Sequence, residues 1–185
     1  MQDLNLTVLA GPTAVGKGTI SRKLIEKYPN VYLSISATTR PARENELPDV
    51  HYHFLSRDEF EHRINQGDFL EWAVVHGLNM YGTLKEPILE ANAASRPALL
   101  EIDLQGARAV KKLVPNANFV FLAPPSFEEL ITRLGIRGTE SRDEREKRLE
   151  TAREELSAKD EFDHIIVNDS IDVAVEELAK IMNLK

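Results

Sequence analysis

Apolar residues along this chain alternate between short strand-like runs and longer stretches with helical spacing. Leu6, Val8 and Ala10 have the pattern of a buried strand, and further apolar runs predict strands at residues 31–36, 98–103, 118–123 and 164–168. Apolar residues recur every three or four positions, as in an amphipathic helix, at residues 84–94, 106–114, 127–134 and 173–183. This alternation predicts an α/β fold with a parallel sheet covered by helices on both faces.

Two stretches depart from the alternation. Residues 34–83 contain short strands around 52–55 and 69–75, separated by a helix that begins at Ser56, and residues 126–155 are dense in charged side chains. Capping-box spacing, which marks helix N-termini, occurs at Ser56 with Glu59, Ser126 with Glu129 and Ser141 with Glu144. We therefore predict one domain, with a core at 1–33, 84–125 and 156–185, an inserted mixed α+β lobe at 34–83 and a helical lid at 126–155.

The loop after the first strand has the form of a phosphate-binding P-loop. It reads Gly11-Pro12-Thr13-Ala14-Val15-Gly16-Lys17-Gly18-Thr19 and leads into a helix whose apolar face holds Ile20, Leu24, Ile25 and Tyr28. Backbone N–H groups at a helix N-terminus attract an anion, and a lysine adds a full positive charge. The sequence therefore predicts binding of a nucleoside triphosphate, the alternative being an ordinary glycine-rich turn.

One position of this loop departs from the usual P-loop. A serine or threonine normally follows the lysine, and its hydroxyl helps to hold Mg²⁺. Gly18 stands there in this chain, and the hydroxyl comes one residue later, at Thr19. We therefore expect the metal to be held mainly by nucleotide oxygens and water, which Mg²⁺ tolerates.

Composition narrows the possible partners and compartments. The net charge of −7 argues against broad nucleic-acid binding, which needs a basic face. The absence of cysteine excludes disulfides and thiolate metal sites, and it fits a reducing compartment. We see neither a signal peptide nor an apolar run approaching the ~18 residues of a membrane span. We expect a cytoplasmic protein without a membrane partner, and the pattern does not specify an oligomeric state.

Further segments follow the P-loop in a distinctive order. They lie at residues 36–43, 52, 69–72, 81–83, 101–106, 124–126, 137–139 and 166–169. In this order and spacing the chain resembles the guanylate kinases over essentially its whole length. The resemblance implies a P-loop fold with a GMP-binding lobe and a lid, and transfer of the γ-phosphoryl group of ATP to GMP with Mg²⁺ as cofactor. The family commonly has Ser-Gly-Ala where this chain has Thr13-Ala14-Val15.

The resemblance also implies roles for individual residues. The GMP site would comprise Ser36, Arg40, Arg43, Tyr52, Glu71, Tyr81, Thr83, Glu101 and Asp103. ATP would be bound by Gly11, Pro12, Thr13, Ala14, Val15, Gly16, Lys17, Gly18, Thr19, Asn168 and Asp169. The catalytic residues would be Lys17, Arg133, Arg137 and Arg148. No metal ligand is assigned, although Asp103 and Thr19 are candidates for a contact through water. Glu101 occupies a position that is more often aspartate.

The chemistry of guanine supports the role given to Glu71. Guanine presents two neighbouring donors, N1–H and the exocyclic amine, and one carboxylate accepts from both. Adenine has no proton on N1 and would leave the carboxylate unpaired. Such mispairing of a buried polar group discriminates between substrates by ~10⁴–10⁵.

Other interpretations of the sequence stay open. One is a kinase for another nucleoside monophosphate, and a second is a peptide-binding module that has lost catalysis, which the intact Gly11, Gly16 and Lys17 disfavour. A third is a metal hydrolase built on His51 and His53, which lacks a third ligand at a recognisable spacing. Within the charged stretch, we interpret three side chains as a solvated helix surface: Arg142, Arg145 and Lys147.

Overall fold

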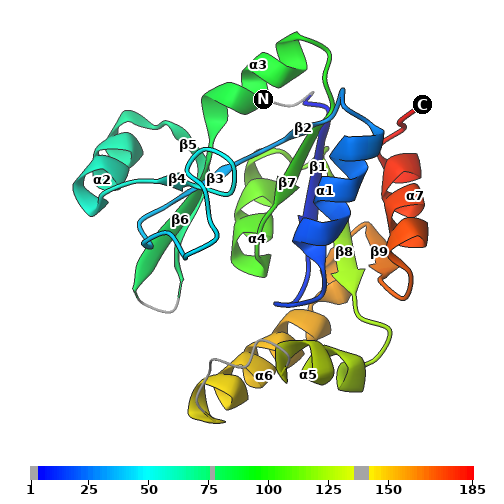
Figure 1. Cartoon of the computed structure of the whole chain (residues 1–185). Helices are drawn as coiled ribbons and strands as arrows, with labels where there is room; N and C mark the ends of the chain where they lie inside the picture. The colour runs from blue at the N-terminus through cyan, green and yellow to red at the C-terminus, as the bar shows by residue number, and fades with distance from the viewer. Residues whose placement is uncertain (1–3, 76–77, 136–141) are drawn as a thin grey trace.

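The computed structural model describes residues 4–75, 78–135 and 142–185, and within the last range it leaves out the side chains of 142–145 and 148. This part of the chain forms two separate β-sheets, joined by helices and by extended segments (Figure 1). A pair of helices extends below the larger sheet in the same view.

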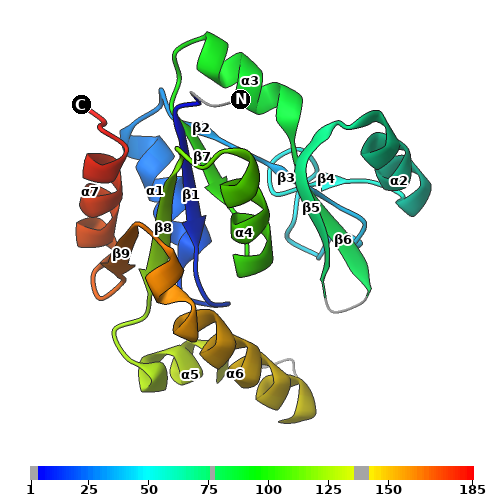
Figure 2. The same ribbon diagram turned by 180° about the vertical axis from the view of Figure 1, so that it is seen from behind.

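The larger sheet forms the core. Its strands are parallel and lie in the order β2-β7-β1-β8-β9. They are β1 (Leu6–Ala10), β2 (Tyr32–Leu33), β7 (Ala98–Glu101), β8 (Asn118–Ala123) and β9 (His164–Val167). Helices α1 (Lys17–Lys27) and α7 (Ile171–Ile181) cover one face, and α4 (Leu104–Leu113) covers the other, as the two opposite views show (Figures 1 and 2). The predicted α/β fold is confirmed.

The covering helices explain why β1 is apolar at successive positions. All five of its residues are buried. Leu9 packs with the residues of α1 and α7 on one side, whereas Val8 packs with Ala107 and Val110 of α4 on the other. A strand buried on both faces needs apolar side chains pointing both ways. Each fully buried leucine or valine contributes roughly 1.5–3 kcal/mol, so this core holds the loop after β1 firmly in place.

The smaller sheet lies to one side of the core and is mixed. Its order is β4-β3-β6-β5, and only the β3–β4 pair is parallel. The strands are β3 (Ser36–Thr38), β4 (His53–Phe54), β5 (Phe69–Val75) and β6 (Asn79–Leu84). Helix α2 (Arg57–Gln66) packs on this sheet through Phe60, whose ring stacks on Phe69 with centroids 4.4 Å apart. Helix α3 (Lys85–Ala93) then returns the chain to the core.

The structure corrects several of the predicted strands. The run at 98–103 ends at Glu101 as β7, and the run at 164–168 ends at Val167 as β9. The single run at 31–36 is divided between β2 and β3, which belong to different sheets. Strand β6 was not predicted, because Gly82 interrupts its apolar pattern. The glycine is required by packing, since a Cβ there would lie 2.8 Å from the ring of Phe69. Helix starts also differ: α3 begins at Lys85 instead of 84, and α7 at Ile171 instead of 173. Helix α4 begins at Leu104 instead of 106, because the Asp103 carboxylate caps it by accepting from the Gly106 N–H at 2.7 Å.

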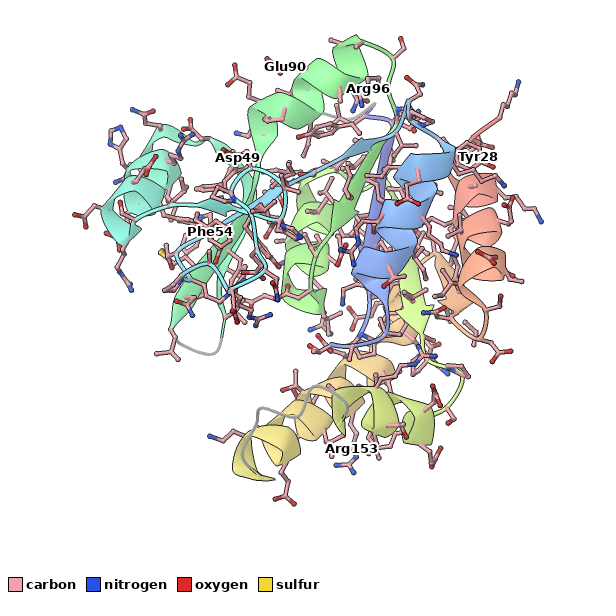
Figure 3. All side chains as sticks on the ribbon, in the orientation of Figure 1. Tyr28, Asp49, Phe54, Glu90, Arg96 and Arg153 are labelled. Carbon is pink, nitrogen blue, oxygen red and sulfur yellow. The ribbon has the colours of Figure 1, made fainter. Side chains whose placement is uncertain are left out.

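Helices α5 (Phe127–Gly135) and α6 (Arg142–Ser157) pack against each other and against the loop after β1. Leu130, Leu134 and Ala152 form a small cluster that includes Ala14. Arg153, labelled in Figure 3, lies over the ring of Phe127 at 5.0 Å. A short 3₁₀ helix, η1 (Lys159–Glu161), leads to β9.

Two of the predicted helix caps are confirmed by hydrogen bonds. The Ser56 hydroxyl accepts from the Glu59 N–H at 3.2 Å, and the Ser126 hydroxyl accepts from the Glu129 N–H at 3.1 Å. The third pair begins at Ser141 and lies outside the described residues. Among the helices that the structure describes, none has both the length and the apolar character needed to cross a bilayer.

Candidate active site

The loop between β1 and α1 has the geometry of a P-loop. Gly11 has φ +147° and Gly16 has φ +103°, a region that L side chains rarely adopt. Gly16 is the residue before α1, so the backbone N–H groups that follow it point out of the helix N-terminus. Ala14 also has a positive φ, of 65°, at the tip of the loop. The strained backbone is held by the core beneath it.

Side chains from two other segments, and Lys17 of the loop itself, brace this backbone. The Asn168 amide donates to the Val15 carbonyl at 2.7 Å and is buried. The Arg133 guanidinium donates to the carbonyls of Val15 and Asn168, both at 3.3 Å, and its Nε donates to Glu129 at 3.1 Å. Lys17 Nζ donates to the carbonyls of Gly11 at 2.6 Å and Pro12 at 3.2 Å. These bonds place the predicted residues Lys17, Arg133 and Asn168 around one loop.

Gly11→Ala is expected to lower the free energy of unfolding by roughly 3 kcal/mol. The new Cβ would lie 2.3 Å from the Leu122 carbonyl oxygen on β8, at a φ that strains any L residue. Gly67→Ala is the matched control, because its φ is +74° and no atom lies within 4 Å of the added Cβ. The control should lose only roughly 1 kcal/mol. Urea unfolding measures both values, and equal losses would contradict the assigned contact.

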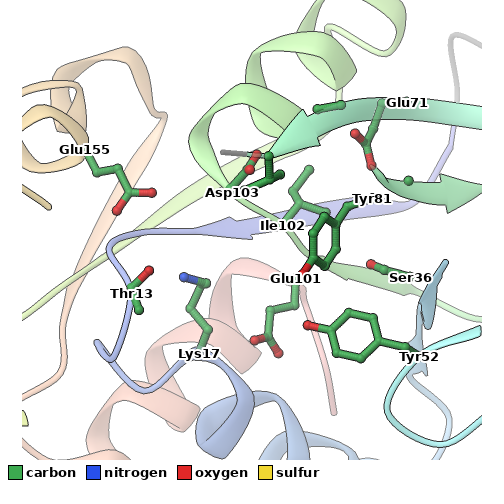
Figure 4. Close-up of a pocket in the computed structure, with 13 residues that line it drawn as sticks. Thr13, Lys17, Ser36, Tyr52, Glu71, Tyr81, Glu101, Ile102, Asp103 and Glu155 are labelled. Carbon is green, nitrogen blue, oxygen red and sulfur yellow. The ribbon is translucent and has the colours of Figure 1, made fainter. Parts of the chain in front are cut away.

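A cavity of about 250 Å³ lies between the P-loop and the smaller sheet (Figure 4). Lys17 and Thr13 line it from the P-loop side, and Glu71 and Tyr81 line it from β5 and β6. Among the described residues that line it, four are carboxylates and one is a lysine: Glu71, Glu101, Asp103, Glu155 and Lys17. The P-loop and the predicted guanine-reading residue therefore share one cavity.

Glu71 lies on the wall of this cavity formed by the smaller sheet. The antiparallel register of β5 and β6 places it opposite Thr83, whose hydroxyl donates to Glu71 Oε1 at 2.6 Å. Ser36 pairs with Thr83 from the neighbouring strand β3, so the three predicted guanine-reading residues lie together. Burial raises the pKa of Glu71 to about 7, helped by the charge of Asp103 and opposed by the hydrogen bonds from Thr83.

Arg40, Tyr52 and Tyr81 form a second group on the same lobe. Arg40 Nε donates to the Tyr81 hydroxyl at 3.1 Å, and its guanidinium lies 5.4 Å from the ring centre of Tyr52. The two tyrosine rings meet edge to face, with centroids 6.0 Å apart. Both tyrosines line the cavity. Arg43 differs from this group, because its side chain is 64% exposed.

Glu46 belongs to this group but was missed from the sequence. Its carboxylate accepts two hydrogen bonds from Arg40 Nη2, at 2.9 and 2.8 Å, and one from the Arg43 N–H at 2.9 Å. Burial acts to raise the pKa of Glu46, but the Arg43 amide and the Arg40 guanidinium outweigh it and hold the pKa below its ordinary value. The signal available in the sequence was an acid three residues after Arg43, within a turn.

Asp103 and Glu101 occupy the carboxyl end of β7, where ligands of parallel sheets bind. Asp103 caps α4, as described above. Glu101 lies beside Gly18, where an added Cβ would be 3.5 Å from Oε1. Burial raises the pKa of Glu101, and the charge of Lys17 partly offsets the effect. Thr19 is exposed and does not line the cavity.

Glu155 is the second residue that the sequence analysis missed. It lies near the end of α6, is 9% exposed, and lines the cavity beside Lys17 and Thr13. Ala152 lies three residues earlier, on the buried face of the same helix. The signal that could have identified Glu155 was therefore an acidic residue three positions after an alanine, on the same face of the helix.

The remaining predicted residues either are not described by the structure or are exposed. Arg137 lies outside the described residues, and Arg148 belongs to α6 but its side chain is not described. The side chains of Arg142 and Arg145 are likewise not described, whereas Lys147 is exposed. Asp169 is exposed at the end of β9.

The two histidines considered for a metal site contact their own loop. The His51 ring accepts from the Leu47 N–H at 3.0 Å, and the His53 ring lies 2.7 Å from Asp49. In the part of the chain that the structure describes, no three His, Cys, Asp or Glu side chains converge on a point that could hold a metal. A protein-only metal centre at these histidines is therefore not supported.

Comparison with known proteins gives a consistent result. The family model for guanylate kinase matches residues 3–185. The guanylate kinase of Bifidobacterium longum is 53% identical over 177 residues, covering 94% of this chain and 90% of the relative. That of Corynebacterium jeikeium is 49% identical over 185 residues, with 98% of each chain covered.

Solved structures show the same relationship. The guanylate kinase of Anaplasma phagocytophilum has a TM-score of 0.80 at 30% identity, over 98% of this chain and 86% of that chain. A shikimate kinase from Bacteroides thetaiotaomicron, with a TM-score of 0.52 at 16% identity, shares the fold alone. With the P-loop and Glu71 in one cavity, and with near-complete coverage by the family model, the chain belongs to the guanylate kinase family.

Proposed function

We propose that MgATP and GMP meet in the cavity between the P-loop and the smaller sheet, where the γ-phosphoryl group passes from ATP to GMP. The observation that carries this proposal is that Lys17 and Glu71, from opposite sides, line the same cavity. Guanylate kinases are ATP:GMP phosphotransferases, and this chain is one by family.

The donor side is the P-loop. The N–H groups at the start of α1 receive the ATP phosphates, since they carry positive partial charge and have no partner within the helix. Lys17, the first residue of α1, adds a full positive charge. Its present acceptors are the carbonyls of Gly11 and Pro12, which lie at the base of the loop. Asn168 and Arg133 hold the loop in shape from behind.

The acceptor side is the lobe formed by the smaller sheet. Glu71 accepts from guanine N1–H and from the exocyclic amine, and Ser36 and Thr83 complete the base site. Arg40 and the two tyrosines hold the GMP phosphate, with Arg43 approaching from the surface. The acceptor phosphate has a second pKa near about 6 and is largely ionised at neutral pH, so no general base is required. Catalysis consists of positioning and neutralisation of charge.

We propose that arginines from the lid meet the charge on the transferring group: Arg137, Arg148 and Arg133, which would exchange its bonds to the Val15 and Asn168 carbonyls for the phosphoryl oxygens. Planar guanidinium groups suit phosphoryl oxygens because two N–H groups donate in parallel. Closure of the lobe and the lid, as proposed for residues 34–83 and 126–155, would exclude water and prevent hydrolysis of ATP.

The residues of the cavity suit Mg²⁺. This ion prefers oxygen ligands and keeps several of its waters, and the carboxylates of Glu101 and Asp103 lie at the end of β7 beside Lys17. Asp103 would face the metal through water. A Mg²⁺ ion held there would supply positive charge that offsets the negative charge of the phosphates. Because Gly18 has no hydroxyl to offer the metal, other oxygens, from nucleotide, water or nearby carboxylates, would have to take that place.

The cytoplasm is the compartment that we propose, supported by the cysteine-free composition. The net charge of −7 argues against a nucleic-acid partner.

A coupled assay of ADP formation tests the acceptor. GMP, dGMP, AMP, UMP and CMP are supplied in turn with MgATP. GMP is expected to give a far higher kcat/KM than AMP, UMP or CMP, because it alone of these four presents two adjacent donors to Glu71, and dGMP, which has the same base, shows whether the 2′-hydroxyl matters. Equal turnover of AMP would point to a kinase for another monophosphate, and no turnover of any acceptor would favour a silent binding module.

A further inference from the structure

The active-site cavity has an excess of negative charge that the steps above leave unexplained. Both substrates are anions, yet the described lining holds four carboxylates and a single lysine. Three of the carboxylates have a defined partner or role. Glu71 bonds Thr83, Asp103 caps α4, and Glu101 lies against Gly18 near Lys17. Glu155 is the fourth, and its carboxylate accepts a hydrogen bond from the Thr13 backbone amide.

Glu155 differs from the others in having a buried oxygen without a partner. Its Oε2 has no accessible surface and no hydrogen-bond partner among the described residues. Glu155 as a whole is 9% exposed. Buried charges in proteins are normally paired or coordinate metals, because an isolated buried carboxylate is expensive. The unpaired oxygen therefore indicates a ligand that binds in the cavity.

The position of Glu155 is fixed by the packing of α6. Ala152 of the same helix belongs to the cluster that contacts Ala14 at the tip of the P-loop. Figure 4 shows Glu155 reaching from the end of α6 toward Thr13 and Lys17, with Asp103 on the neighbouring wall. The carboxylate thus faces the place where the phosphates of ATP must bind.

We propose that Glu155 is a carboxylate of the divalent-cation site and faces the Mg²⁺ that accompanies ATP, together with Asp103. The proposal rests on MgATP as the donor. It also accounts for the glycine at position 18, since a carboxylate from the lid helix supplies the oxygen that the P-loop lacks. Mg²⁺ is characteristically bound through one or two carboxylates plus phosphates and water.

The electrostatic environment of Glu155 agrees with this assignment. Burial raises its pKa, the charge of Asp103 adds to the effect, and Lys17 and the Thr13 backbone amide act in the opposite direction. A bound cation would relieve both the burial and the repulsion between the two carboxylates. An additional phosphate without a cation would increase the repulsion. Glu155 should therefore affect free ATP and MgATP in opposite ways.

Calorimetric titration with ATP, in the absence of an acceptor, tests the proposal on the full chain. Binding is measured with excess Mg²⁺ and with EDTA for the wild type, for Glu155→Gln and for the control Glu154→Gln, whose side chain is exposed on the same helix. Mg²⁺ is expected to strengthen ATP binding in the wild type and the control. In Glu155→Gln this strengthening should shrink about tenfold, the lower end of the effect of removing partners around a metal.

Three results would overturn the assignment. An unchanged effect of Mg²⁺ in Glu155→Gln would remove Glu155 from the metal site. If Glu155→Gln strengthened ATP binding equally in Mg²⁺ and in EDTA, Glu155 would act only as a negative charge that repels the phosphates. A wild type without any effect of Mg²⁺ would refute the proposed MgATP donor along with this inference.

A second variant, Glu155→Asp, and a second measurement, water-proton relaxation, distinguish loss of the metal contact from a folding defect. Glu155→Asp keeps the charge with a shorter reach, so its Mg²⁺ effect should fall between those of the wild type and Glu155→Gln. Water-proton relaxation by Mn²⁺·ATP reports the metal directly and should change in Glu155→Gln but not in Glu154→Gln. Thermal unfolding confirms that each variant is folded, and relaxation unchanged in Glu155→Gln would contradict the proposal.

Discussion

Lys17→Ala is expected to lower kcat by about 10²–10³-fold, the usual effect of removing one preorganised group that stabilises charge in the transition state. Lys17 is the only cation among the described residues that line the cavity, so none of those residues can replace its charge. Steady-state rates with saturating GMP measure the loss.

The control for this variant is Lys23→Ala, farther along α1. Lys23 forms an exposed ion pair with Asp172 at 2.8 Å, and such pairs contribute roughly 0–1 kcal/mol. The control should therefore keep its kcat. Since Lys17 also bonds the carbonyls of Gly11 and Pro12, thermal unfolding of Lys17→Ala is measured alongside. A folded Lys17→Ala enzyme with near-normal turnover would refute the role of this lysine.

Glu71→Gln is expected to lower the preference for GMP over AMP by about 10²-fold or more, out of the ~10⁴–10⁵ that such a polar contact can supply. The amide keeps one acceptor but turns an N–H toward one of the two guanine donors, N1–H and the exocyclic amine. The ratio of kcat/KM for the two acceptors measures the effect. Glu61→Gln, on the exposed surface of α2, is the control. An unchanged ratio would show that guanine is recognised elsewhere.

The same residue makes GMP use depend on pH. Burial raises the pKa of Glu71 to about 7, so the carboxylate is ionised above this pH and protonated below it. Only the ionised form accepts both guanine donors. The kcat/KM for GMP should therefore fall as the pH decreases through about 7. Glu71→Gln should lack this component and keep the titrations of the GMP phosphate, whose second pKa is about 6, and of the other cavity carboxylates. Identical pH profiles in both enzymes would contradict the assignment.

Local patterns were sufficient to predict the core. The run at β8 was predicted with the correct ends, because a strand buried on both faces is apolar at nearly every position. The P-loop was equally clear, since Gly11, Gly16 and Lys17 are each required by backbone geometry or charge. Ser36, Glu71 and Thr83 were predicted by resemblance, and the register of β3, β6 and β5 brings them together.

Features that depend on contacts distant in sequence were not predicted. Gly82 weakened the strand signal of β6, and only the position of Phe69 explains the glycine. Glu46 and Glu155 were missed because each acquires its significance from a partner or cavity formed on folding. An acidic residue on a charged helix has the same sequence pattern whether it faces solvent or the P-loop.

The division of one apolar run between β2 and β3 has a mechanical consequence. Only Ser34 and Ile35 separate these strands, and Ser34 is tied to the core by its N–H bond to the Leu99 carbonyl at 2.9 Å. The chain returns at Leu84, directly before α3. These two chain connections define an axis, so we expect the smaller sheet to move as a rigid body about the line joining them, with Leu70 of β5 sliding over its apolar contacts with the core. That hinge would change the gap between Glu71 and Lys17 without disturbing the hydrogen bonds within either sheet.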